Sequence, residues 1–102
     1  MYTVQIALSA QQDLLRLKAY LENEFGREVA NEVLRKIIGK IKNFEEFPLI
    51  GKPLSNRIDL PTDYMYLVIE KNYIFYRIED RVVRIIRILD TRQDFMRILF
   101  DK

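Results

Sequence analysis

Arginine is the residue type in this chain best suited to chemistry, because the sequence contains no histidine and no cysteine. Histidine is the commonest general base near neutral pH and the commonest metal ligand, so catalysis here would rest on carboxylates, Tyr, Lys or Arg. Cleavage of RNA by its own 2′-hydroxyl needs a proton acceptor, a cation on the phosphate and an acid for the leaving oxygen. The side chains that we consider candidates for these catalytic roles are Arg77, Arg87, Asp90 and Arg92.

Other cations and aromatic rings could bind a nucleic acid without reacting with it. Guanidinium and ammonium groups pair with phosphate, and aromatic rings stack on unpaired bases. Each candidate also has a structural alternative: an arginine can pair with Glu70, Glu79 or Asp94, and a tyrosine can pack in a sheet with its hydroxyl at the rim. The candidates for phosphate binding are Lys52, Arg57, Arg84 and Arg97, and those for base stacking are Tyr66, Tyr73 and Phe95.

Strand alternation limits which arginines can share one site. Arg77 would share a face with Tyr73, whereas Arg84 and Arg87 are three residues apart and would point to opposite faces of a regular strand. At most one of these two arginines would then join any single site. Asp90 stands just before a predicted helix, so it could act as a cap as well as an acid or base.

The first half of the chain predicts a strand followed by two helices. In residues 2–8, large apolar side chains alternate with Thr3, Gln5 and Ala7, which is typical of a strand. Ser9 and Gln12 form a capping box, so a helix would begin there and end at Gly26. Residues 27–44 carry a broad apolar stripe, and we expect them to form a second helix that packs antiparallel to the first.

The second half predicts strands and a short final helix. Thr91 and Asp94 form another capping box, so a helix would run from Thr91 to about Leu99. The expected order is β-α-α-β-β-β-β-α, an α+β fold in which an N-terminal helical hairpin packs on one face of an antiparallel sheet. The remaining elements are a loop at 45–56, a short strand at 57–60 that Pro61 stops, and a meander of three strands at 64–70, 73–79 and 82–89.

The composition of the chain indicates what class of protein it is. The 102 residues, 49% of them hydrophobic and 31% charged, suit one globular domain spanning residues 1–102. No run of about 18 apolar residues predicts a membrane span, and the absence of cysteine fits a cytoplasmic protein. Neither metal-ligand spacing nor a glycine-rich phosphate loop is present, so we expect no metal and no cofactor. The net charge of +2 does not by itself predict nucleic-acid binding, although the basic excess gathers after Arg81.

Five sequence segments follow one another over nearly the whole chain in a recurring order. They are Ser9-Ala10 with Asp13-Leu14, then FPLIG at 47–51, YMYLV at 64–68, NYIFYRI at 72–78 and RILDTRQDF at 87–95. In these segments and in their order, the chain resembles the RelE/ParE superfamily of bacterial toxins from type II toxin–antitoxin modules. The resemblance implies a toxin that inhibits growth and is neutralised by a cognate antitoxin, whose disordered C-terminal part wraps the toxin and folds on binding.

The same resemblance leaves the target open. RelE-like members are endoribonucleases that cut messenger RNA in the decoding site of the ribosome, whereas ParE-like members inhibit DNA gyrase and are not nucleases. A third alternative is a decayed toxin, a non-catalytic binding module that only engages the antitoxin. Both toxin hypotheses, the endoribonuclease and the gyrase inhibitor, predict a cytoplasmic protein.

Three positions depart from the pattern of the superfamily. Met65 stands where many relatives have an arginine that would contact phosphate, and Asp90 stands where many have a histidine that could act as acid or base. Phe95 stands where tyrosine is common. These changes weaken a transfer of nuclease chemistry, although some RelE-like nucleases rely on Lys, Arg and Tyr in place of His.

Overall fold

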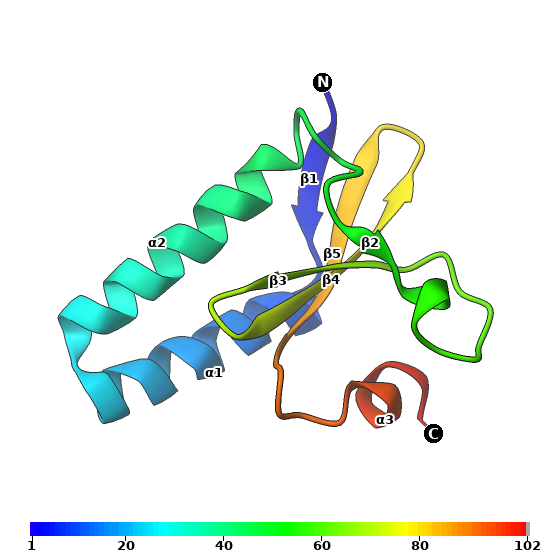
Figure 1. Cartoon of the computed structure of the whole chain (residues 1–102). Helices are drawn as coiled ribbons and strands as arrows, with labels where there is room; N and C mark the ends of the chain where they lie inside the picture. Colours follow the sequence, from blue (N-terminus) through cyan, green and yellow to red (C-terminus); the bar gives the residue numbers. More distant parts are fainter. Residues whose placement is uncertain (102) are drawn as a thin grey trace.

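A five-stranded sheet organises the computed structural model, which describes residues 1–101. Two long helices form a hairpin on one side of the sheet, and a short helix lies on the other side near the C-terminus (Figure 1). None of the described helices has the length and apolar character needed to cross a membrane. The elements are β1 (Thr3–Ile6), α1 (Leu8–Phe25), α2 (Arg27–Asn43), β2 (Lys52–Pro53), the 3-10 turn η1 (Leu54–Asn56), β3 (Met65–Ile69), β4 (Asn72–Glu79), β5 (Val82–Asp90) and α3 (Phe95–Phe100).

The strand order is β1-β5-β4-β3-β2, which confirms the predicted α+β fold and its central meander. Strands β3, β4 and β5 pair antiparallel through short turns, because consecutive hairpins need only local contacts. Strand β1 instead pairs parallel with β5, with Thr3 opposite Val82 and Ile6 opposite Ile85. A parallel pair needs a long crossover connection, and the helical hairpin is the first part of it.

Side-chain alternation along the strands divides the apolar residues between two cores. The larger core lies between the helical hairpin and the sheet, and each fully buried aliphatic side chain there contributes roughly 1.5–3 kcal/mol. The smaller core lies on the opposite face, beneath η1 and α3. The first contains Ala10, Ile37, Ile41, Phe44, Ile74, Tyr76, Val83, Ile85 and Ile88, and the second contains Leu54, Tyr73, Phe75 and Leu89 with Phe95 packed against them.

The buried Tyr76 ties the loop after α2 to the sheet. Its hydroxyl donates to the carbonyl of Pro48 at 2.9 Å and accepts from the amide of Gly51 at 3.0 Å. A Cβ at Gly51 would lie 2.6 Å from the carbonyl oxygen of Tyr66, so only glycine fits this close approach. The loop thereby positions β2 to pair with the edge of β3.

Three predicted boundaries differ from the structure. Helix α1 begins at Leu8 with Ala7 as its N-cap and no side-chain cap, so the capping box at Ser9 is wrong. The short strand lies at Lys52–Pro53, paired with β3, and not at 57–60, where the chain turns and bends. Buried Leu54 explains this difference, because it draws the chain into η1 and away from the sheet edge.

The last helix also starts later than predicted, at Phe95 and not at Thr91. Its N-cap is Asp94, whose carboxylate accepts from the amide of Arg97 at 3.3 Å. A hydrogen-bonded turn precedes it, in which the side chain of Gln93 accepts from the amide of Asp90 at 2.8 Å. Residues 91–93, which the sequence pattern assigns to the first turn of the helix, therefore belong to this turn.

Candidate functional site

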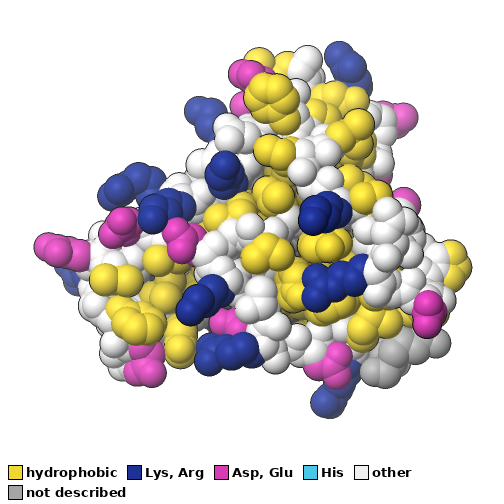
Figure 2. Space-filling model, viewed as in Figure 1, with side chains coloured by type: hydrophobic (Ala, Val, Ile, Leu, Met, Phe, Trp, Pro, Cys, Tyr) yellow, Lys and Arg dark blue, Asp and Glu magenta, His cyan; other side chains and the backbone are white. Residues whose placement is uncertain are grey.

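The candidate residues form two groups in the structure. One group lies on the sheet face that carries α3, and the other lies between α1 and the C-terminal end of β5. Figure 2 shows basic side chains across the middle of one face of the molecule, lying on hydrophobic surface, with most acidic side chains nearer the periphery.

The three base-stacking candidates lie together in an aromatic cluster on the α3 side of the sheet, although Tyr73 is only 6% exposed and so offers little ring surface to a base. The ring centroid of Tyr73 lies 6.0 Å from that of Tyr66 and 5.2 Å from that of Phe95. The guanidinium carbon of Arg57 lies over all three rings, at 5.5 Å from Tyr66, 5.2 Å from Tyr73 and 5.7 Å from Phe95. We call these four residues the Arg57 cage. Polar contact with Tyr66, and then with Tyr73, raises the pKa of Arg57, so the side chain stays charged.

Two further arginines on this side of the sheet share one carboxylate. Arg77 and Arg84 are opposite each other on β4 and β5. Arg77 donates to one oxygen of Glu79 through Nε at 2.8 Å, and the Nε of Arg84 donates to the other at 3.3 Å. Arg77, more than Arg84, lowers the pKa of Glu79. The predicted structural alternative, pairing with Glu79, is thus confirmed for both arginines.

The two remaining phosphate-binding candidates are exposed at the margins of the first group. Lys52 lies on β2 opposite Tyr66, and Arg97 lies on α3. Within residues 1–101, neither side chain forms an ion pair. These two cations add positive charge to the face without joining a defined cluster.

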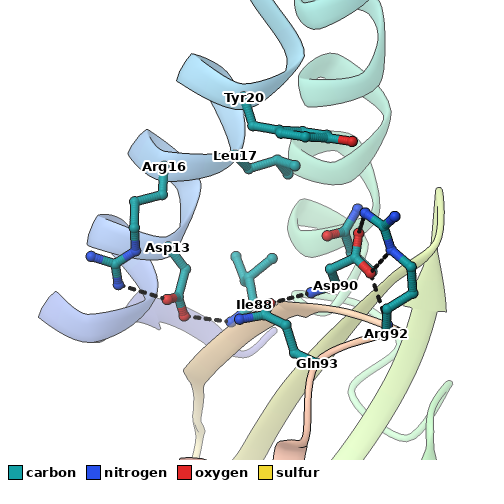
Figure 3. Close-up of a pocket in the computed structure, with 9 residues that line it drawn as sticks. Asp13, Arg16, Leu17, Tyr20, Ile88, Asp90, Arg92 and Gln93 are labelled. Atoms are coloured by element: carbon teal, nitrogen blue, oxygen red, sulfur yellow. Dashed lines mark hydrogen bonds and ion pairs between the residues drawn. The ribbon is translucent and has the colours of Figure 1, made fainter. Parts of the chain in front are cut away.

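The second group is built around Asp13, a residue that the sequence reasoning missed as a site residue. Its buried carboxylate accepts from Arg87 through Nε and Nη2, both at 2.8 Å. It also accepts from the amide of Ile88 at 2.9 Å (Figure 3). Strand β1 ends at Ile6 while β5 continues to Asp90, so Asp13 satisfies an edge amide that has no strand partner. Hydrogen bonding to Asp13 raises the pKa of Arg87.

A bulge interrupts β5 between its two arginines, Arg84 and Arg87. Ile85 lies opposite Tyr76 and Arg87 lies opposite Phe75, so Ile86 is one extra residue in the strand. The odd spacing of the two arginines predicts opposite faces only for a regular strand, which β5 is not. Even so, Arg84 binds Glu79 and Arg87 binds Asp13 of α1, so the two arginines do not share a site. A bulge leaves little trace in an apolar sequence, which is why the pattern could not reveal it.

Asp90 and Arg92 pair with each other beside a cavity of about 480 Å³. The Nε of Arg92 lies 2.9 Å from one carboxylate oxygen of Asp90 and its Nη2 lies 3.2 Å from the other, while the backbone amide of Arg92 also donates to Asp90. Arg92 lowers the pKa of Asp90, and Asp90 raises the pKa of Arg92. Leu17 and Tyr20 of α1 face this pair across the cavity (Figure 3).

The four catalytic candidates therefore do not meet at one place. Arg87, Asp90 and Arg92 lie near the cavity under α1, each held by an opposite charge, and Arg77 lies in the first group. Asp90 is the only carboxylate among them, and its lowered pKa makes it a poor proton acceptor. No cluster of three or more potential metal ligands lies within the described part of the chain.

Comparison with known proteins gives a family and a fold. A family model described as "ParE toxin of type II toxin-antitoxin system, parDE" matches residues 4–95. A structure titled "Chromosomal ParDE TA system from P. aeruginosa" is similar, with 19% identity, a TM-score of 0.75, and coverage of 88% of this chain and 96% of that one. The toxin–antitoxin complex RelBE2 from Mycobacterium tuberculosis is similar at 23% identity and a TM-score of 0.55, covering 87% and 96%. No curated protein matches the sequence significantly.

Proposed function

The chain belongs to the ParE toxin family of type II toxin–antitoxin systems, and from that premise we propose that it inhibits growth by binding DNA gyrase. We propose further that a cognate antitoxin holds it inactive in the cytoplasm. Solved structures with this fold are titled as toxin–antitoxin systems of the ParDE and RelBE2 kinds, which supports an antitoxin partner.

The dispersal of the catalytic candidates is the observation that carries the choice of gyrase over RNA cleavage. Transfer of a proton from a 2′-hydroxyl needs a base, a cation and an acid around one phosphate. Here Arg87 is bound to Asp13, and Asp90 is bound to Arg92. A toxin that acts by binding needs no such arrangement.

Exposed apolar side chains at the corner of the helical hairpin support a protein partner. Phe25 is 57% exposed, and Tyr20 and Val29 are 43% and 40% exposed. All three line one side of a groove that reaches the turn between β3 and β4. Apolar side chains gathered in this way are typical of protein contact surfaces, and we assign this one to the antitoxin.

Two parallel readouts test the proposal after induction of the chain in a bacterium. We expect growth arrest together with loss of negative supercoiling in a reporter plasmid, and primer extension should show no codon-phased cuts in messenger RNA. Purified chain should also inhibit supercoiling by gyrase in vitro. Codon-phased cuts with unchanged supercoiling would contradict the proposal, and co-expression of the antitoxin should restore growth.

Cleavage of ribosome-bound messenger RNA is the second candidate function, and the Arg57 cage favours it. Aromatic rings beside a fixed guanidinium could stack on a base and contact its phosphate. The same primer-extension experiment decides between the two candidates. A chain that arrests neither growth nor supercoiling, yet still binds the antitoxin, would be the decayed toxin.

A further inference from the structure

Arg57, which follows η1, differs from the arginines of the sheet in the kind of partner that holds it. Arg77 and Arg84 bind Glu79, and Arg87 binds Asp13, so a carboxylate offsets each of these charges. Arg57 forms no ion pair with any residue of 1–101 and is held by three aromatic rings. Aromatic rings fix a guanidinium through their negative faces without neutralising it, so the charge of Arg57 remains available.

The rings that hold Arg57 are themselves fixed. Tyr73 is only 6% exposed and packs at 5.2 Å against the fully buried Phe75. Phe95 also packs at 5.3 Å against Phe75. On the other side, the amide of Arg57 donates at 2.9 Å to the carbonyl of Leu54, a residue with no exposed surface. A charged group is thus held in one place while its outer edge faces solvent.

We propose that Arg57 binds a carboxylate on the toxin's target protein, and that Tyr66, Tyr73 and Phe95 position it for this contact. The inference rests on the proposed function, in which the target is a protein. Arg57 is exposed and has no carboxylate partner among residues 1–101, so its guanidinium can still bind a carboxylate, the group that it suits best through paired hydrogen bonds. Because the guanidinium is ordered before binding, little side-chain entropy is lost on contact.

The surrounding charges favour an acidic protein segment over a nucleic-acid backbone. A phosphate backbone is bound by a row of free cations. Here Arg77 and Arg84 are already engaged by Glu79, which interrupts such a row. Lys52, opposite Tyr66 on the next strand, could attract a second acidic side chain of the same segment.

Three substitutions test the proposal, with Arg81 as the matched control. Arg81 is also exposed and also lies over an aromatic ring, Tyr2, at 5.1 Å, but it is at the far turn between β4 and β5. We expect Arg57→Gln to weaken gyrase inhibition about 30-fold and to abolish growth arrest, as loss of an interface hot spot does. Arg57→Lys keeps the charge but not the paired hydrogen-bond donors, so it should weaken gyrase inhibition roughly 5- to 10-fold. Arg81→Gln should stay within about twofold of the parent.

Two further measurements separate binding from folding and target from antitoxin. The thermal midpoint of each variant shows whether the cage merely stabilises the fold. If Arg57→Gln unfolds, inhibition by the folded Arg57→Lys variant tests the role of Arg57 in binding. Affinity for the antitoxin should be unchanged within about twofold in all three variants, since the cage is remote from the hairpin corner assigned to it.

Several results would overturn the inference. Full inhibition by a folded Arg57→Gln variant would do so, and so would loss of antitoxin binding with target inhibition intact. If the parent chain instead cuts messenger RNA, the proposed function fails by itself. Slower cutting by Arg57→Gln would then also overturn the carboxylate assignment, because the ligand would be phosphate, and unaffected cutting would remove any role for Arg57 in target binding.

Discussion

Replacing Asp13 by Asn should destabilise the fold more than any other single change of charge that we consider. The Asp13 side chain is 4% exposed, and it binds both Arg87 and the amide of Ile88. Asparagine keeps the shape but removes the charge and one acceptor, so Arg87 or Ile88 loses a partner. The expected effect is therefore on the attachment of α1 to β5.

The magnitude follows from the burial of the two partners. Breaking a buried ion pair by removing one partner costs about 3–5 kcal/mol. The Arg87 side chain is 23% exposed and can regain some water, and the remaining carbonyl of Asn still accepts one hydrogen bond. We therefore expect a loss of about 2–3 kcal/mol. For a chain of this length, that loss lowers the thermal midpoint by roughly 10–15 °C.

Urea unfolding monitored by far-ultraviolet circular dichroism measures this loss, and Arg16→Gln supplies the control. Arg16 also contacts Asp13, at 3.1 Å, but its side chain is 67% exposed, so its loss should cost under about 1 kcal/mol. A double-mutant cycle with Arg87→Met should give a coupling energy of about 1–3 kcal/mol. Equal effects of Asp13→Asn and Arg16→Gln, or a coupling near zero, would refute the reasoning.

Three smaller predictions concern a helix glycine, the buried hydroxyl and the turn before α3. Gly39→Ala should stabilise the chain by about 0.5–1 kcal/mol, because a Cβ there meets no atom within 4 Å, and a lower urea midpoint would contradict this. Tyr76→Phe should cost about 1–3 kcal/mol by leaving the amide of Gly51 unpaired. Burial raises the pKa of Tyr76 above its ordinary 10.0, so the contribution of the neutral hydroxyl to folding stability is full below pH 10.0. That contribution is lost as pH rises through the pKa of the folded state. Urea midpoints should therefore fall less steeply in alkali for the Phe variant. Arg92 lowers the pKa of Asp90 below 3.8, so the contribution of the ionised Asp90 to folding stability is present above that pH and is lost as pH falls through the folded pKa. The urea midpoint of Asp90→Asn should therefore fall less steeply in acid than that of the parent chain.

Apolar periodicity was sufficient to predict the layers of this fold. The stripes of the two long helices and the alternation in residues 64–89 specify which sides must be buried, and burial of apolar surface is the dominant favourable term in folding. The same alternation predicted that Arg77 shares a face with Tyr73, and the structure places both on the side of the sheet that carries α3. These predictions depend on local pattern, which a single sequence displays directly.

The pairing of charges, by contrast, depends on contacts between residues that are distant in the chain. Asp13 and Arg87 are 74 residues apart, and nothing in the pattern of α1 marks its aspartate as the partner of a strand arginine. The bulge at Ile86 and the early end of β1 bring them together, and both follow from how the strands fit. Residue types and order thus determined the family, the layers and the inventory of cations. Only the tertiary structure decided which cations are neutralised, because a carboxylate within hydrogen-bonding distance, and not the identity of an arginine, decides whether its charge remains free for a partner.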